Sequence, residues 1–284
     1  MFKKILVCDD GTGPSWDAAQ TAAAIAFAFC SEVIVLTVSR AATEMQAAEH
    51  QPRVRPEVSR LFEMRDIPFR YLLEQNHRTT ADTILQVAER EKPDLIVEGC
   101  RGLRGVSELV LGSVSSSVLH HAKCPVLIAR GYNAPCGTEG FDNIMLASDG
   151  SPFALDAARV AVRMAQRFRT PLTILNVYEE LSSATVPGDK DRLIDRAESD
   201  TYSDRWLEYV AKPVREFAND EGVMCSFVQK GGKPADTVIS FANVHEVDLI
   251  VVGSRGLGNY SRLLMGSVSD RIAHYANCPV LVVR

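Results

Sequence analysis

The residues of this chain that could do chemistry are short groups of aspartate, glycine, serine and arginine, each placed after an apolar run, and each group occurs twice. Glycines after a strand let backbone N–H groups approach a ligand, because no Cβ intervenes. The first set of candidate binding residues is Asp10, Gly11, Thr12, Val38, Gly99, Arg101, Gly102, Gly112, Ser113, Val114 and Ser115. The second set is Asp149, Gly150, Ser151, Val177, Gly253, Arg255, Gly256, Gly266, Ser267, Val268 and Ser269.

The second set shows what such residues could bind. Gly266-Ser267 is expected to open a helix, whose first N–H groups are unpaired and whose dipole is positive there, so this end favours phosphate. Ser267 would add a hydroxyl and Arg255 a positive charge. Asp149 offers acceptors for a ribose hydroxyl or an adenine amine, and Val177 an apolar edge for a base. The pattern predicts a mononucleotide pocket, although each glycine pair taken alone could be no more than a tight turn.

Two other phosphate motifs are absent. The segment Gly231 to Pro234 lacks the Gly-x4-Gly-Lys-Ser/Thr pattern of a Walker A loop, and a proline follows its lysine. No Gly-x-Gly-x-x-Gly follows an expected strand, so a dinucleotide is disfavoured.

The chain is an internal duplication. Residues 4–19 recur as 143–158, at an offset of 139, and residues 94–130 recur without a gap at an offset of 154, with 21 identities in 37 positions. A period of domain size indicates two copies of one domain and not a solenoid. The expected domains are residues 1–131 and 141–284, joined by a Gly- and Pro-rich linker at 132–140.

Apolar β-branched runs alternate with helical segments in each copy, which predicts a parallel sheet with helices on both faces. In such a sheet, ligands bind beyond the carboxyl ends of the strands, at the point where the strand order reverses. The expected strands are 5–8, 33–38, 68–73, 94–99 and 125–130, then 144–147, 172–177, 223–228, 249–252 and 280–283. The expected helices of the first copy are 14–29, 54–65, 79–91 and 112–122, and the second helix of copy two is expected over 190–220.

Composition excludes several classes of protein. The net charge of −5 argues against a nucleic-acid partner. Seven scattered cysteines without a C-x-x-C pair suit reduced thiols in a cytoplasmic protein. No apolar run is long enough to cross a membrane, and the first residues read as a strand and not as a signal peptide. His120-His121 are adjacent in an expected helix, so their rings diverge, and no metal site is expected.

The Gly-x2-Gly-x9-Gly-Ser spacing, the early Asp-Gly-Ser and the final Cys-Pro-Val-Leu-Val together resemble the universal stress protein family, once per copy. The resemblance implies two tandem, doubly wound, parallel five-stranded sheets of α/β class with strand order 3-2-1-4-5, of the adenine-nucleotide α-hydrolase-like type. It implies that the last strands of the copies pair antiparallel within one chain, giving a pseudo-two-fold pair, with a homodimer of chains left open. It also implies an ATP, ADP or AMP ligand, with or without Mg²⁺, and protein partners that the sequence does not identify.

The two copies differ beside the glycine loop. Asp9 and Glu98 of copy one stand where copy two has Ser148 and Val252. A carboxylate in a buried strand needs a partner, and extra negative charge opposes phosphate binding unless Mg²⁺ or an arginine compensates. We therefore expect copy two to bind ATP more tightly than copy one.

The expected function is a stress-response regulator that binds an adenine nucleotide and hydrolyses it slowly or not at all. No general base or arginine finger is obvious beside the loops, so no residue is assigned a catalytic role. A weak ATPase or phosphotransferase and an interaction scaffold with degenerate pockets remain the alternatives.

Overall fold

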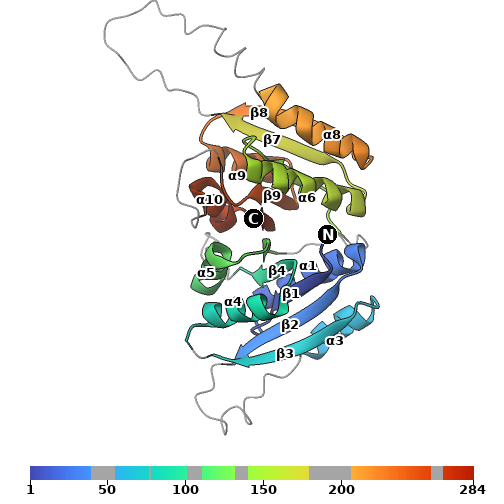
Figure 1. Cartoon of the computed structure of the whole chain (residues 1–284), viewed down its shortest axis with the longest axis vertical. Helices are drawn as coiled ribbons and strands as arrows, with labels where there is room; N and C mark the ends of the chain where they lie inside the picture. The colour runs from blue at the N-terminus through green and yellow to red at the C-terminus, as the bar shows by residue number, and fades with distance from the viewer. Residues whose placement is uncertain (40–54, 77, 101–110, 132–139, 179–205, 257–264) are drawn as a thin grey trace, which may run out of the picture.

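A computed structural model describes residues 1–39, 55–76, 78–100, 111–131, 140–178, 206–256 and 265–284 of the chain (Figure 1). The first copy contains the strands β1 (Lys4–Cys8), β2 (Glu32–Ser39), β3 (Phe69–Gln75), β4 (Leu95–Gly99) and β5 (Val126–Ala129). Its helices are α1 (Gly13–Phe29), α3 (Pro56–Glu63), α4 (Thr80–Glu91) and α5 (Ser113–His121). These elements match the strands and helices expected of this copy within a few residues.

The second copy repeats this order with strands β6 (Ile144–Ala147), β7 (Leu172–Tyr178), β8 (Cys225–Gly231), β9 (Leu249–Gly253) and β10 (Val280–Val283). Its helices are α6 (Pro152–Phe168), a π-helical turn η1 (Leu207–Ala211), α8 (Lys212–Asp220), α9 (Pro234–Val244) and α10 (Ser267–Tyr275). The helix expected over 190–220 is described only from residue 206, and its earlier part lies outside the described residues.

The expected bounds of β8 were wrong by two or three residues. The strand begins at Cys225 because the N–H of Val223 still bonds the carbonyl of Ala218 in the turn after α8. It continues to Gly231 because its pairing with β7 extends as far as Tyr178. Propensity alone does not reveal how long the partner strand is.

The ten strands form one sheet in the order β3-β2-β1-β4-β5-β10-β9-β6-β7-β8. Each half has the order 3-2-1-4-5 and is parallel throughout, as the resemblance implies. The halves meet where β5 pairs antiparallel with β10, for example Leu127 opposite Leu281. The implied pairing of the last strands is thus confirmed, and it covers one edge of each half-sheet.

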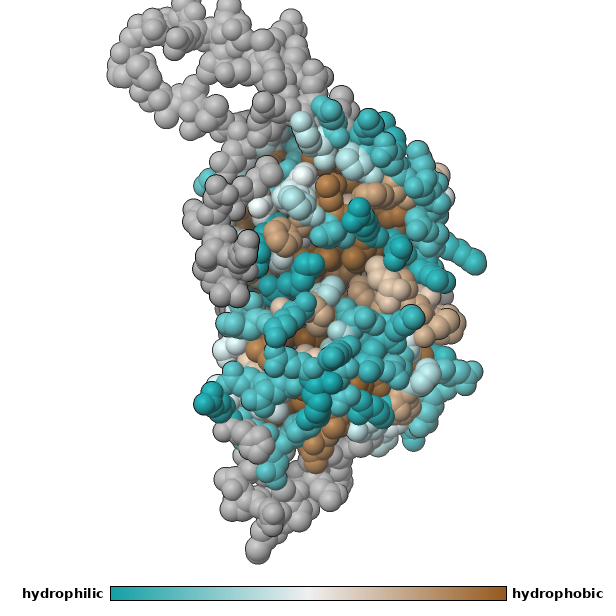
Figure 2. All heavy atoms as spheres, in the orientation of Figure 1, coloured by the Kyte–Doolittle hydropathy of each residue, from teal (hydrophilic) through white to brown (hydrophobic). Residues whose placement is uncertain are grey.

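Helices cover both faces of this sheet and enclose two apolar cores. One core lies under α1, α3, α6 and α8 and includes Phe2, Phe62 and Phe141. The other lies under α4, α5, α9 and α10 and includes Leu119 and Ile272. Figure 1 shows these two groups of helices on opposite sides of the sheet, and Figure 2 shows hydrophobic groups between hydrophilic residues on the helices.

Candidate functional site

Each half contains a pocket at the point where its strand order reverses. In copy one the reversal falls between β1 and β4, and in copy two between β6 and β9. The carboxyl ends of these strands are followed by the residues expected to bind a ligand, which is where doubly wound sheets bind theirs. The cavities measure about 450 Å³ in copy one and about 510 Å³ in copy two.

Most of the expected binding residues line these cavities. Those of copy one are Asp10, Thr12, Val38, Gly99, Gly112, Ser113, Val114 and Ser115. Those of copy two are Asp149, Val177, Gly253, Arg255, Gly256, Gly266, Ser267, Val268 and Ser269. Gly11, Gly150 and Ser151 are not among the lining residues, and Arg101 and Gly102 lie outside the described residues. The structure thus brings together in each cavity residues that lie far apart in the sequence.

Ser151 belongs to the helix and not to the cavity wall. It is the N-cap of α6, and its hydroxyl accepts a hydrogen bond from the N–H of Ala154 at 3.2 Å. Only 1% of it is exposed. A serine between a turn and an apolar helix is as typical of a cap as of a ligand site, so the sequence could not separate the two roles.

The N-termini of α5 and α10 face the cavities without a capping side chain. Their N-cap residues are Gly112 and Gly266, and neither helix start has a side-chain cap hydrogen bond. The hydroxyls of Ser115 and Ser269 instead donate to the carbonyls of Gly99 and Gly253, at 3.2 and 2.6 Å. These bonds tie each helix start to the end of the neighbouring strand, so the uncapped N–H groups stay directed at the cavity.

The aspartate after the first strand shapes its own turn in both copies. One oxygen of Asp10 accepts from the N–H of Thr12 at 3.1 Å, and one oxygen of Asp149 accepts from the N–H of Ser151 at 3.0 Å. These short loops place the side chain at the cavity, because the carboxylate bonds the backbone two residues on. An acidic acceptor therefore lines the same cavity as the helix N-terminus.

The glycines serve two different purposes. A Cβ on Gly99 would lie 2.1 Å from the carbonyl oxygen of Pro14, and one on Gly253 would lie 2.7 Å from that of Phe153. These two glycines allow the strand to approach the start of the next helix, so our expectation that they serve the ligand was incomplete. A Cβ on Gly256 would lie 2.4 Å from the Oδ2 of Asp149, so this glycine does make room within the site.

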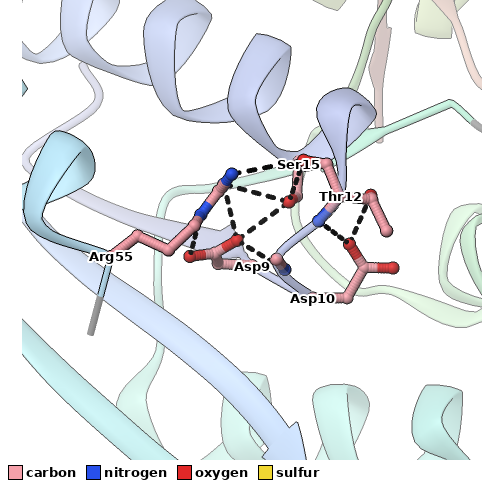
Figure 3. Close-up of polar contacts among 6 residues, drawn as sticks. Asp9, Asp10, Thr12, Ser15 and Arg55 are labelled. Carbon is pink, nitrogen blue, oxygen red and sulfur yellow. Dashed lines mark hydrogen bonds and ion pairs between the residues drawn. The ribbon is translucent and has the colours of Figure 1, made fainter. Parts of the chain in front are cut away.

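We did not identify Arg55 from the sequence, although its side chain is paired with Asp9, one of the two extra acids of copy one. Its guanidinium donates from Nη2 to Oδ1 of Asp9 at 2.7 Å and from Nε to Oδ2 at 3.2 Å (Figure 3). Ser15 and the N–H of Gly11 also donate to Oδ1 of Asp9. Two parallel bonds to one carboxylate are the strongest geometry of arginine. Nothing in the sequence relates positions 9 and 55, because only the fold brings the start of α3 to the end of β1.

Glu98 is the other acid that distinguishes copy one. It lines the cavity, is 2% exposed, and has no hydrogen-bond partner for either carboxyl oxygen among the described residues. Burial raises the pKa of Glu98 to about 7, against a smaller lowering by the hydroxyl of Ser115 and the thiol of Cys8 beside it. The partner that the sequence led us to expect is therefore not found there, and the carboxyl instead retains its proton close to neutral pH.

Copy two places a positive charge beside its cavity. The guanidinium carbon of Arg255 lies 4.9 Å from the ring centroid of Phe153, and Arg255 lines the cavity. This stacking holds the charge next to the glycine loop. Among the described residues no group of three or more His, Cys, Asp or Glu side chains is placed to hold a metal ion.

The fold and these cavities define a tandem, doubly wound α/β protein with a cavity at a helix N-terminus in each half. Residues 1–130 and 140–284 both match the model of the universal stress protein family. The chain therefore belongs to the universal stress protein family. None of the helices in the described part of the chain is long and apolar enough to cross a membrane.

Relatives carry the same family name. Universal stress protein YxiE of Bacillus subtilis is 30% identical over 149 residues, which is 51% of this chain and 99% of the relative. Universal stress protein Rv2623 of Mycobacterium tuberculosis is 31% identical over 191 residues, which is 67% of this chain and 61% of that relative. A solved universal stress protein from Archaeoglobus fulgidus superposes with a TM-score of 0.75 over 100% of this chain and 99% of its own, at 22% identity, and so shares the fold.

Proposed function

We propose that this chain is a stress-response regulator that binds an adenine nucleotide, ATP, ADP or AMP, with its principal site in the pocket of copy two. The observation that carries the proposal is the uncapped N-terminus of α10, which opens into the same 510 Å³ cavity as Asp149 and the apolar side chain of Val177. One cavity thus offers separate places for phosphate, sugar and base. Hydrolysis is slow or absent, because the described residues that line this pocket include no histidine, glutamate or lysine, and the carboxylate of Asp149 already accepts a bond from the N–H of Ser151.

The phosphates belong at the helix end. The residues Gly266 to Ser269 line the cavity, and the first N–H groups of a helix together with its dipole favour an anion. Arg255 adds a charge on the same side. A flexible nucleotide tail can use these donors without a lysine, which the Walker A arrangement would require.

The base and ribose belong near the ends of β6 and β7. Leu175, Val177 and Val238 give the cavity an apolar wall that suits a planar base. The exposed carboxylate of Asp149 lies at the mouth and accepts hydrogen bonds from a ribose hydroxyl or an adenine amine.

Of the two extra acids of copy one, Asp9 and Glu98, only Glu98 makes its pocket a poorer nucleotide site than the pocket of copy two. The charge of Asp9 is compensated by Arg55 within copy one, so Asp9 no longer argues against nucleotide there. Glu98 remains, where copy two has Val252. A carboxyl at this place penalises a bound phosphate whenever it is ionised.

A matched pair of proline variants tests the site. Ser267→Pro removes one N–H and one hydroxyl from the start of α10 but preserves the helix, since proline is favoured at the first helical position. The residue before it, Gly266, already has φ −70° and ψ 142°, which suits the position before proline. Ser113→Pro is the equivalent change at α5, where Gly112 has φ −68° and ψ 158°.

The readout is the ligand released by heat from freshly purified protein, identified by mass spectrometry and counted per chain. We expect about one adenine nucleotide per chain, lost in Ser267→Pro and retained in Ser113→Pro. The reverse pattern would overturn the choice of copy two. If no nucleotide is released and none is taken up on addition of ATP, the scaffold function replaces this one. Steady-state ATP turnover well above the rate of Ser267→Pro would favour an ATPase instead.

A further inference from the structure

The two pockets are built on equivalent positions but differ in polarity at their inner end. Most residues that line one cavity have a counterpart, related by the offsets of the internal repeat, that lines the other. Cys8 replaces Ala147, and Glu98 replaces Val252, so a thiol and a carboxyl stand where copy two has two apolar groups. The difference is concentrated where β1 and β4 end, beside the start of α5.

Glu98 is held in this wall without a charged partner among the described residues. It is the residue before the last of β4, it is 2% exposed, and neither carboxyl oxygen has a hydrogen-bond partner among the described residues. An ionised carboxylate in such a place costs several kcal/mol unless it is paired. A proton or a ligand that donates a hydrogen bond removes this cost.

The groups that surround Glu98 offer no described cation. From β1 come the thiol of Cys8 and, just beyond it, the carboxylate of Asp10, which raises the pKa of Glu98 further. The charge of Arg55 is already paired with that of Asp9. Glu98 is in register with Ile128 on β5, which is apolar.

Thr80 and Ile84 of α4, which line the same cavity, carry no charge, and the neighbour of Glu98 on α5 is neutral too. It is Ser115, whose hydroxyl proton is directed to the carbonyl of Gly99. Burial raises the pKa of Cys8 well above its ordinary value, so the thiol stays neutral as well. The charge at the inner end of the first pocket therefore changes with the proton on Glu98.

We propose that the first pocket binds its anionic mononucleotide together with one proton, which is carried by Glu98, whereas the second pocket binds without this proton. This inference rests on the proposed nucleotide function. The phosphate site at Gly112 to Ser115 and Glu98 line the same cavity, so an ionised Glu98 repels the ligand. The protonated carboxyl instead donates a hydrogen bond to a phosphate or ribose oxygen.

The linkage has a definite sign. Below about pH 7 Glu98 already carries its proton, and the first pocket binds without a net proton change. Above that pH the proton must be taken from solvent, and the affinity falls up to tenfold for each further pH unit. Val252 in the second pocket does not titrate, so the second pocket lacks this dependence. Stress that acidifies the surroundings of the protein would then fill the first pocket.

The test is calorimetric titration of the full chain with ATP between pH 6.0 and 8.5, in buffers of different ionisation enthalpy, which gives the number of protons bound. Ser267→Pro isolates the first pocket and Ser113→Pro isolates the second. The terminal phosphate of ATP titrates in both variants alike, so the difference between them reports on Glu98. Glu98→Gln and Glu98→Val, made in the Ser267→Pro background, hold the position neutral.

We expect the first pocket to take up close to one proton more than the second at pH 8.0, and its affinity to fall about fivefold from pH 7.0 to 8.0. Glu98→Gln should remove both effects and retain the affinity seen at pH 6.0. Equal proton numbers in the two pockets would overturn the inference, and so would a first pocket that stays empty at every pH while the second binds; both leave the proposed function standing. Absence of binding in both pockets would overturn the inference and the proposed function together.

Discussion

Asp9 and Glu98 are acids of copy one that copy two lacks, and they differ in their hydrogen-bond partners among the described residues. Asp9 accepts hydrogen bonds from a bidentate arginine and from two further donors. Glu98 has no such partner, and its pKa rises to about 7. Sequence reasoning identified both as anomalous but could not distinguish them, because the deciding residue, Arg55, is remote along the chain.

The ion pair of Asp9 and Arg55 should be important for stability. The side chains are 5% and 16% exposed, and removal of one partner from a buried pair leaves an uncompensated charge. We expect Arg55→Met to lower the free energy of unfolding by about 3 kcal/mol, measured by urea denaturation. The double variant Asp9→Ser, Arg55→Met should recover most of this loss, because copy two has Ser148 at this position. Equal stability of the single and double variants would contradict the pairing.

Glu98 should make stability depend on pH. Its folded pKa of about 7 lies above the ordinary 4.5, so the folded state holds the proton more firmly than the unfolded state. The resulting stabilisation is complete below about pH 4.5 and is lost as the pH rises to 7, by about 3 kcal/mol. Glu98→Gln should flatten this part of the profile of urea midpoints against pH. Parallel profiles for the two proteins would show that Glu98 titrates normally.

Among the elements, the strand ends and helix starts determine where the sites lie. Hydrophobic runs and the repeat were sufficient to predict nearly all the described elements, because parallel buried strands have a strong apolar signature, whereas the strand order was implied by the family resemblance. The sequence did not show which glycines make room for a neighbouring helix and which make room within the site. This depends on which backbone lies against each Cα, and Gly99 and Gly253 meet a helix there while Gly256 meets Asp149.

Two glycine variants of copy two should therefore behave differently. Gly253→Ala places a Cβ against the backbone of Phe153 and Ala154, which cannot yield without moving α6, so we expect its Tm to fall by several degrees. Gly256→Ala meets only the tip of the exposed Asp149 side chain, which can rotate. Its Tm should stay within about a degree of the parent, while nucleotide affinity falls. Thermal melting with and without ATP measures both, and similar Tm losses in the two variants would contradict this division.

For the whole molecule, the two copies are bound together by reciprocal arginines. Arg130 follows β5 and donates to the carbonyls of Ala273, His274 and Ala276 at the end of α10. Arg284 follows β10 and donates to the carbonyl of Leu119 in α5. Positions 130 and 284 are related by the repeat offset of 154. Each copy thus completes the last turn of a helix in the other, which supplies a cation where the helix dipole is negative.

Loss of Arg130 should weaken the junction. The side chain is 3% exposed, and Arg130→Met would leave carbonyl groups at the end of α10 without this donor. We expect a loss of about 2 to 3 kcal/mol in unfolding free energy and faster proteolysis between the copies. Exposed Arg159→Met is a suitable control, since its ion pair with Asp156 is open to solvent. If both variants unfold at the same urea concentration as the parent, the hydrogen bonds of Arg130 to α10 contribute nothing to stability.

The duplication leaves one fold with two unlike pockets, of which the second is free of the buried carboxyl. Titration of ATP into ligand-stripped protein at pH 8.0 tests this most directly, because Glu98 is then ionised for most of the time. We predict one tight site per chain, absent in Ser267→Pro and unchanged in Ser113→Pro. Two sites of equal affinity, or one site that only Ser113→Pro removes, would contradict the assignment of the principal site to copy two.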